Sequence, residues 1–386
     1  MFYLYYQNRR RAPPHTMLIK SKFRPPWWLR NPHAQTLVAA KIMRHPSSRM
    51  YRERLVTPDN DFVDIDWSDE GSIPKTIPNA IPTASLTTSP TAMPGQAPAD
   101  DESLRLNPAS PTPANKPLVI IFHGLTGSSN STYVRALAHG LNGLGYRSVA
   151  MNFRGCSGEP NLKRESYHSA HTKDISFVID SIRQRFPDAP LAATGYSLGG
   201  NALLKYLAIT PDNPLQHAIS VSPPLQLEEG AKRMQSGLSR IYQNRLVGQL
   251  KNALDEKHQR YPHLGIDQIS YKSARTFREF DAAATVPLHG FESVDHYYES
   301  ASTLKDLPLI NTLTHVLFSQ DDPFFTKVCI PSSDAMSAQV TFELSARGGH
   351  VAFIGSSGIL RGHSWLTDHL CALHHHRFQD AIDRAR

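Results

Sequence analysis

Short apolar runs rich in β-branched residues recur along the chain from residue 117 onward, separated by segments whose apolar residues fall at helical spacing. The apolar runs predict buried strands at 117–124, 146–155, 191–197, 217–224, 314–322 and 339–349. The helical spacing predicts helices at 131–144, 171–185, 199–209 and 364–375. Strands that alternate with helices in this way predict an α/β fold built on a mostly parallel, doubly wound sheet.

Three segments depart from this alternation. Residues 52–67 predict a hairpin that adds antiparallel edge strands to the sheet. Residues 71–117 hold ten of the 29 prolines and no aromatic residue. They predict a disordered insertion, because such a stretch cannot bury enough apolar surface to offset its ordering entropy. Residues from about 225 to 313 have a mainly helical pattern and predict a cap over the carboxyl end of the sheet.

The charge of the chain is unevenly distributed. The net charge is +7, yet residues 1–54 contain twelve Lys and Arg and a single acid, Glu53, which gives +11 there and −4 for the remainder. A basic end on a mildly acidic body argues against nucleic-acid binding and leaves peripheral contact with a membrane surface open. No run approaches the 18 apolar residues of a transmembrane helix. Three dispersed cysteines indicate neither a disulfide framework nor a metal site, so we expect a cytoplasmic protein.

One short motif carries a specific chemical prediction. Residues Gly195 to Gly199 read G-x-S-x-G, with an apolar strand directly before the motif and a helix directly after it. A strand–turn–helix elbow holds its serine in a strained conformation at the end of the sheet, and the tight turn requires small flanking residues. We therefore predict that Ser197 is a nucleophile.

A serine hydroxyl needs a base, and a carboxylate must orient that base. In this arrangement the acid follows a late strand and the histidine follows the last one. The strand at 314–322 ends in Asp321 and Asp322, and the strand at 339–349 runs into His350 after two glycines. We favour Asp322 as the carboxylate because Pro323 fixes the turn after it. Asp321 is kept as the alternative, and the other aspartate would cap the turn.

The negative charge that develops during acyl transfer needs two N–H donors. The residue after the nucleophile, Leu198, supplies one candidate amide, and Leu125, in the loop after the strand at 117–124, supplies the other. We interpret His123 as a structural residue that holds this loop.

Other chemistry-bearing residues fit a structural role better. Cys156 has no base paired with it by spacing, and the loop 154–159 around it either shapes a pocket or is structural. The run His374-His375-His376 points in three directions on a helix and predicts no metal site. No glycine-rich nucleotide motif is present, so no cofactor is expected.

Together these segments resemble the YheT-like branch of the α/β-hydrolases, the AB hydrolase-4 group. The resemblance runs from about Phe23 to the last predicted helix and lies in NPHAQT (31–36), HGLTG (123–127), NFRGCSGEPN (152–161), GYSLGGN (195–201), REFD (278–281), DDPF (321–324) and GGHVAFIG (348–355). It implies an α/β-hydrolase fold and a charge relay of Ser197, Asp322 and His350. We expect an N-terminal extension at 1–22 and a single domain at 23–386, with 71–117 as an added loop.

The sequence thus predicts a serine hydrolase that cleaves carboxylic esters through an acyl-enzyme on Ser197, without metal or organic cofactor. An acyltransferase shares the first half-reaction and stays open, and so does a non-catalytic binding protein of the same fold. The expected partner is a small-molecule ester with a lipophilic, short- to medium-chain acyl group, because the predicted cap is rich in aromatic residues: Tyr242, Phe277, Phe280, Phe291, Tyr297 and Tyr298. Packing within the core explains these residues equally well. We also expect translation to begin at Met17, which would remove three positive charges.

Overall fold

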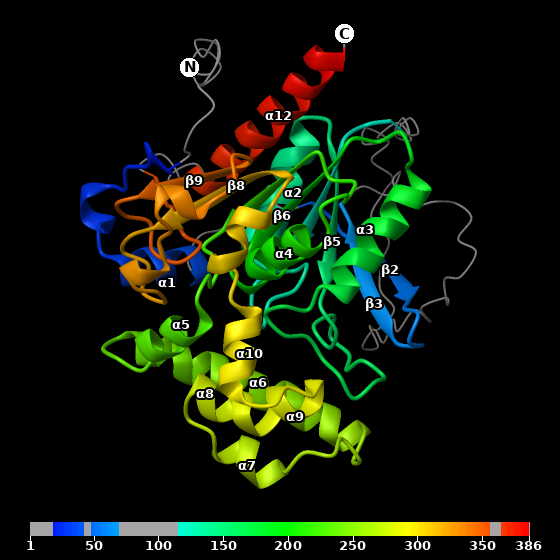
Figure 1. Cartoon of the computed structure of the whole chain (residues 1–386), viewed down its shortest axis with the longest axis vertical. Coiled ribbons are helices and arrows are strands. Elements are labelled where there is room, and N and C mark those ends of the chain that lie inside the picture. The colour runs from blue at the N-terminus through cyan, green and yellow to red at the C-terminus, as the bar shows by residue number, and fades with distance from the viewer. Residues whose placement is uncertain (1–17, 42–47, 69–114, 356–363, 386) are drawn as a thin grey trace, which may run out of the picture.

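The computed structural model describes residues 18–41, 48–68, 115–355 and 364–385. Within these residues a nine-stranded sheet forms the centre of the molecule, in the order β1-β9-β8-β7-β6-β4-β5-β3-β2 (Figure 1). The strands are β1 (Leu18–Lys20), β2 (Tyr51–Val56), β3 (Phe62–Trp67), β4 (Leu118–Phe122), β5 (Arg147–Asn152), β6 (Leu191–Tyr196), β7 (His217–Val221), β8 (Leu313–Ser319) and β9 (Val340–Ser345). Strands β2 and β3 pair in antiparallel fashion, as does β3 with β5, and the remaining pairs are parallel. The predicted α/β sheet and hairpin are confirmed.

Helices cover both faces of this sheet. The helices that flank it are α2 (Thr132–Gly143), α3 (Lys173–Arg185), α4 (Leu198–Ile209) and α12 (Trp365–Ala385), with α1 (Pro32–Lys41) beside the β8–β9 edge. Helix α2 packs against α12 on one face, and α3 packs against α4 on the other. The final helix is ten residues longer than the predicted end at 375, since it extends to Ala385.

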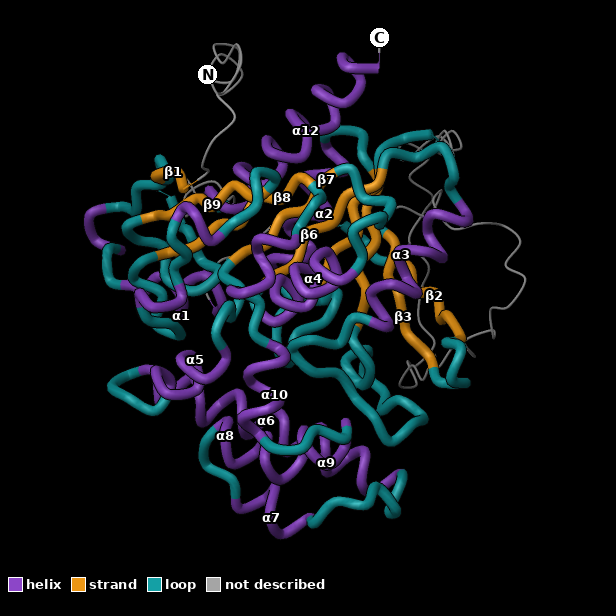
Figure 2. The backbone as a smooth tube through the Cα atoms, viewed as in Figure 1, coloured by secondary structure: helices purple, strands orange, loops and turns teal. Residues whose placement is uncertain are grey.

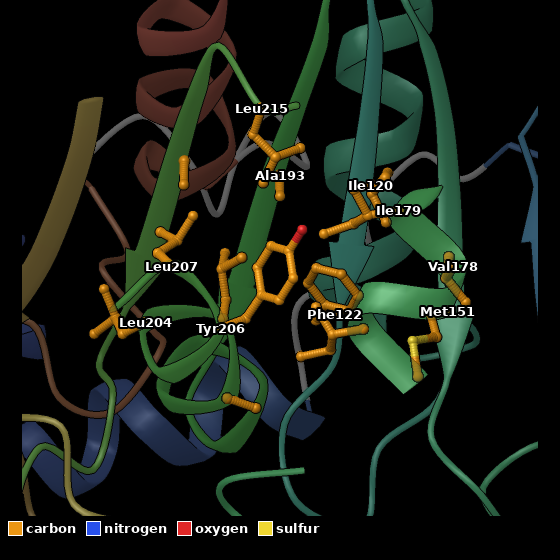
Figure 3. Packing of buried hydrophobic residues seen from close by; sticks show 14 of the residues in the cluster. Ile120, Phe122, Met151, Val178, Ile179, Ala193, Leu204, Tyr206, Leu207 and Leu215 are labelled. Atoms are coloured by element: carbon orange, nitrogen blue, oxygen red, sulfur yellow. The ribbon is translucent and has the colours of Figure 1, made fainter. Parts of the chain in front are cut away.

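Strand β4 shows how the sequence divides between the two faces. Its alternate residues Leu118, Ile120 and Phe122 join the cluster that contains residues of α3 and α4, whereas Val119 and Ile121 join the cluster under α2 and α12. Figure 3 shows Ile120 and Phe122 among the side chains of the first cluster. A parallel strand covered on both faces has no polar side, which explains its continuous apolar run.

A helical insertion separates β7 from β8. It comprises α5 (Leu227–Met234), α6 (Ser239–Arg260), α7 (Gln268–Ser273), α8 (Phe277–Phe280), the π-helical turn Asp281–Thr285, α9 (Val286–His289), α10 (Val294–Ala301) and the 3₁₀ helix Leu304–Leu309. Helices α6 to α9 form a layer of their own beneath the sheet (Figure 2). That layer has its own apolar core, which includes Val247, Tyr271, Phe280 and Leu288.

The N-terminal part of the described chain belongs to the sheet. Strand β1 pairs in parallel with β9, from Leu18 opposite Phe342 to Lys20 opposite Leu344. These residues lie inside the segment 1–22 that the sequence analysis set apart as an extension. The predicted insertion 71–117 falls almost entirely outside the described residues, and so does the predicted start at Met17.

Candidate active site

Ser197 lies at the sharp turn between β6 and α4. Its backbone angles are φ 49° and ψ −118°, a conformation that non-glycine residues rarely adopt. A Cβ atom at Gly195 would lie 2.5 Å from the Gly199 carbonyl oxygen, and one at Gly199 would lie 2.4 Å from the His123 carbonyl oxygen. The turn therefore admits only glycine at these two positions, and it presents the serine at the carboxyl end of the sheet.

Two side chains from later strands meet Ser197 there. The loop after β9 brings His350, whose Nε2 lies 2.9 Å from Ser197 Oγ. The loop after β8 brings Asp322, whose Oδ2 lies 2.8 Å from His350 Nδ1. Because a carboxylate only accepts hydrogen bonds, His350 carries its proton on Nδ1 and offers the Nε2 lone pair to the Ser197 hydroxyl. The structure thus brings together the three residues predicted as nucleophile, base and acid.

The neighbouring aspartate contacts different groups. Asp321 accepts hydrogen bonds from the Gly349 amide, at 3.0 Å, and from the Ser319 hydroxyl. It therefore fixes the loop that carries His350 and does not touch the imidazole. The ring of Phe324 stacks on His350 with centroids 3.9 Å apart, which restricts the orientation of the imidazole.

The N-terminal segment also supports the histidine loop, a role that sequence reasoning missed. The Thr36 hydroxyl accepts a hydrogen bond from the His350 amide at 3.0 Å and donates to the Pro32 carbonyl at 2.8 Å. The fully buried Gln35 amide bonds the Ile354 amide and carbonyl at 2.8 and 3.1 Å, and the Leu29 carbonyl at 3.0 Å. The motif NPHAQT was visible in the sequence, but its partners in the histidine loop, His350 and Ile354, lie more than 300 residues away.

The two predicted amide donors border the same serine. Leu198 begins α4, so its N–H belongs to the unpaired first turn of a helix, and Leu125 lies in the loop after β4. Among the described residues neither amide has a hydrogen-bond partner. A Cβ atom at Gly124 would lie 3.3 Å from Ser197 Cβ, which places this loop directly beside the nucleophile.

Two half-buried tyrosines and the buried His123 hold the Leu125 loop in place. The Tyr133 hydroxyl accepts a hydrogen bond from the Gly124 amide at 2.9 Å, and the Tyr167 hydroxyl accepts one from the Thr126 amide at 2.9 Å. His123 Nε2 accepts a hydrogen bond from the Phe153 amide at 3.1 Å.

The second ring nitrogen of His123 also forms a hydrogen bond with this loop. Because Nε2 accepts, Nδ1 carries the proton and donates to the Gly124 carbonyl at 2.7 Å. Burial lowers the pKa of His123 to about 4, so the ring is neutral. His123 has the contacts of a structural residue.

A cavity of about 460 Å³ opens between the sheet and the helical insertion, with Ser197 in its wall. Four of the six aromatic residues expected in the cap line it, namely Phe277, Phe280, Tyr297 and Tyr298. Tyr242 instead stacks on His33, with centroids 5.7 Å apart, and Phe291 packs edge-on against His168.

Comparison with known proteins identifies the family to which this chain belongs. A family model described as the alpha/beta hydrolase fold matches residues 117–356. YheT of Escherichia coli is 35% identical over 348 residues, which cover 90% of this chain and 91% of YheT. The chain belongs to the YheT-like branch of the α/β-hydrolases. The bovine phospholipase ABHD3 is 28% identical over 88% of this chain and 75% of its own length. The monoacylglycerol lipase of Saccharomyces cerevisiae is 31% identical over 66% of this chain and 58% of its own length.

Burial shifts the pKa of an acid and of a base in the cavity wall of this hydrolase, Asp281 and Lys257. Burial raises the pKa of Asp281 to about 6, although the Thr285 and Tyr298 hydroxyls donate to it at 2.6 and 2.8 Å. Burial lowers the pKa of Lys257 to about 8, while its ammonium donates to Asn161 Oδ1 at 2.8 Å. The sequence analysis gave neither residue a role, although Asp281 ends the segment REFD (278–281), because only the fold places the two side chains in the cavity wall.

The remaining sequence candidates do not join the site. Burial raises the pKa of the Cys156 thiol to about 12, so it is not a thiolate at neutral pH. In the histidine run, His374 is buried and bonds Thr194 and His217 at 2.7 and 2.8 Å, whereas His376 pairs with Asp380 on the surface of α12. The expectation that the run points in different directions is confirmed. No helix among the described residues is both long and apolar enough to cross a membrane.

Proposed function

We propose that this chain is a serine hydrolase that cleaves carboxylic esters. The observation that carries the proposal is the chain of hydrogen bonds from Asp322 through His350 to Ser197, at 2.8 and 2.9 Å, on the elbow between β6 and α4. The names of the relatives, which point to esterase, lipase and phospholipase chemistry, support the same reaction class.

The proposed reaction has two halves. In the first, the Ser197 hydroxyl loses its proton to His350 Nε2 and attacks the acyl carbon, and the imidazolium then protonates the leaving alcohol. In the second, water attacks the acyl-enzyme with His350 again as base and releases the acid. Asp322 holds the imidazole in the tautomer that both halves need and stabilises its charge. It stays ionised throughout.

The amides of Leu125 and Leu198 would stabilise the tetrahedral intermediate. Both are unpaired in the described structure and border Ser197, as donors to a developing oxyanion must be. The rigid hydrogen bonds that hold the Leu125 loop mean that little reorganisation is needed when charge develops.

The cavity supports an ester with a lipophilic acyl group of short to medium length. Its walls combine apolar residues of α5, α6 and α8 with the aromatic rings of Phe277, Phe280, Tyr297 and Tyr298. We expect hydrolysis of nitrophenyl esters to rise with acyl length as the chain fills this cavity and to fall once the chain exceeds it. A rate independent of acyl length would argue that the acyl group lies elsewhere.

A fluorophosphonate probe tests the nucleophile directly. The wild-type chain should be labelled on Ser197 and should hydrolyse esters, whereas Ser197→Ala should lose labelling and at least about 10⁴-fold in kcat. A folded Ser197→Ala variant that retains esterase activity would refute the assignment. Product analysis with added ethanol decides the acceptor, because predominant formation of ethyl ester would make the enzyme an acyltransferase.

A further inference from the structure

Three histidines meet where the helical insertion joins the body of the molecule. His168 and His171 come from the loop before α3, and His289 is the last residue of α9. One ring nitrogen of each lies within 4.8 Å of the other two. The ring centroids of His168 and His289 are 4.6 Å apart, and His168 also lines the cavity.

The ring nitrogens of these three histidines make few hydrogen bonds. Among the described residues, the His289 ring makes no hydrogen bond, and no hydrogen bond joins the three rings to one another. His168 accepts only a long bond from the Ala170 amide, at 3.3 Å. His171 is 4% exposed, and its buried Nε2 lies 3.0 Å from an Asp174 carboxylate oxygen at an angle that forms no hydrogen bond. Buried polar atoms without partners are rare and require an explanation.

A second histidine group provides a contrast. The Nε2 atoms of His315 and His369 both lie 2.8 Å from the same carboxylate oxygen of Glu343. The carboxylate accepts from both Nε2 atoms, so these two nitrogens need no further ligand, although the buried His315 Nδ1 has no hydrogen-bond partner among the described residues. In the described part of the group at the cavity, the Asp174 carboxylate approaches only His171, and no carboxylate is shared between the rings.

We propose that His168, His171 and His289 form a Zn²⁺ site that fastens the helical insertion to the body. Three imidazole nitrogens are a ligand set that Zn²⁺ accepts, with a fourth position left for water. Ligand nitrogens on a tetrahedral Zn²⁺ lie about 3.4 Å apart, so the ring nitrogens, which lie within 4.8 Å of one another, must approach by up to about 1.4 Å through side-chain rotation.

Charges of both signs surround the three rings. The Asp174 carboxylate lies beside His171, whereas positive charges lie near the other two rings. Burial lowers the pKa of His289 and of His168, and these charges lower it further: Lys257 and Arg164 act on His289, and Lys173 acts on His168. Asp174 faces His171 Nε2 at 3.0 Å, so the ligand from this ring would be Nδ1, and a carboxylate behind a ligating histidine orients the ring and raises its basicity. The nearby Arg154 guanidinium does not oppose the ion as a free charge, because it is paired with Asp59, Asp61 and Asp174 at 2.7 to 3.1 Å.

Zinc bound in this way would stabilise the closed arrangement of the insertion. Two ligands belong to the body and one to α9, so only the assembled structure presents all three. A ligand that binds only that arrangement shifts the equilibrium toward it. The site is separate from Ser197, and its occupancy does not depend on the proposed hydrolase reaction.

The test measures Zn²⁺ binding to the untagged full chain after treatment with a chelator. Equilibrium dialysis with metal analysis should find one Zn²⁺ per chain, and Co²⁺ should give the visible absorption of a tetrahedral site. His289→Ala and His168→Gln should each weaken Zn²⁺ binding by at least about 10- to 100-fold. That is the loss when a residue that only supports a ligand is removed, and removal of a ligand itself should cost at least as much. His263→Ala, which alters an exposed histidine of the same insertion, should leave binding unchanged.

Three results would overturn the proposal. The first is that the wild-type chain does not bind Zn²⁺, and the second is that the two ligand variants bind Zn²⁺ as the wild type does. The third is that binding is lost in His369→Ala instead, which would place the ion beside Glu343. Circular dichroism verifies that each variant is folded. Because metal content is measured without substrate, the result is independent of whether the chain hydrolyses esters.

Discussion

Two adjacent carboxylates at the end of β8 face different partners. Asp322 Oδ2 contacts the imidazole of His350, whereas Asp321 accepts the amide hydrogen of Gly349. The two residues lie in the turn after β8, which the Asp322 amide closes on the Ser319 carbonyl at 3.3 Å, and within this turn only Asp322 reaches the histidine ring. The sequence narrowed the choice of the acid to these two aspartates, and the contacts in the structure distinguish their roles.

This difference predicts unequal effects of the two isosteric variants. Asp322→Asn should lower kcat by about 10⁴-fold, because the amide favours the wrong imidazole tautomer. Asp321→Asn removes at most one strong acceptor and should lower kcat by no more than about tenfold. Steady-state kinetics with a nitrophenyl ester measures both. Equal losses in the two variants would contradict the assigned roles.

The raised pKa of Asp281 predicts that the stability of the folded chain depends on pH. Its pKa is raised from 3.8 to about 6 in the folded chain, so between these pH values the folded state binds more protons than the unfolded state. The free energy of unfolding should therefore fall as the pH rises from about 4 to about 6, by at most about 3 kcal/mol from this group. Asp281→Asn should remove this component, which urea unfolding across that pH range measures. An identical pH profile in the variant would show that the carboxyl is not perturbed.

At the level of elements, the close approach of α4 to β4 depends on glycine. A Cβ atom at Gly199 would lie 2.4 and 2.7 Å from the carbonyl oxygens of His123 and Phe122, both backbone atoms that cannot rotate away. Gly199→Ala should therefore destabilise the chain by about 1–3 kcal/mol and lower kcat, because α4 carries the Leu198 amide.

Gly248 on α6 is the matched control for that prediction. A Cβ atom there would meet nothing within 4 Å. Gly248→Ala should raise stability by about 0.5–1 kcal/mol, since alanine restricts the unfolded chain more than glycine does. Thermal and urea unfolding compare the two variants, and a harmless Gly199→Ala would contradict the packing argument.

Elements of strong periodicity were predictable, and irregular ones were not. The strands at 118–122 and 191–196 matched their apolar runs, because a buried parallel strand needs a continuous apolar sequence. The π-helical turn Asp281–Thr285 and the pairing of β1 with β9 had no local sequence pattern of their own. Both depend on packing against distant elements.

At the scale of the whole molecule, Arg154 joins three separate parts of the chain. Its guanidinium pairs with Asp59 and Asp61 at the β2–β3 turn and with Asp174 at the start of α3, and its side chain is 4% exposed. A charge buried in this way is tolerated only because its partners neutralise it.

Arg154→Met should therefore destabilise the chain by about 3–5 kcal/mol, because it leaves buried carboxylates without a counter-ion. Lys232→Met is the control, because Lys232 pairs with Glu228 and Glu229 on the surface and its loss should leave the free energy of unfolding almost unchanged. Urea unfolding measures both. Similar small losses would show that the Arg154 network is not structural.

By itself, the sequence determined the alternation of strands and helices, the elbow at Ser197 and the order of serine, acid and histidine. These features are local, because apolar runs form buried strands and a tight turn requires glycine wherever the chain lies. Only the tertiary structure decided which aspartate faces His350, how Thr36 and Gln35 hold the histidine loop, and that three histidines meet at the cavity. Those contacts join residues that are far apart in the chain, and their geometry depends on how the sheet and the helical insertion pack together.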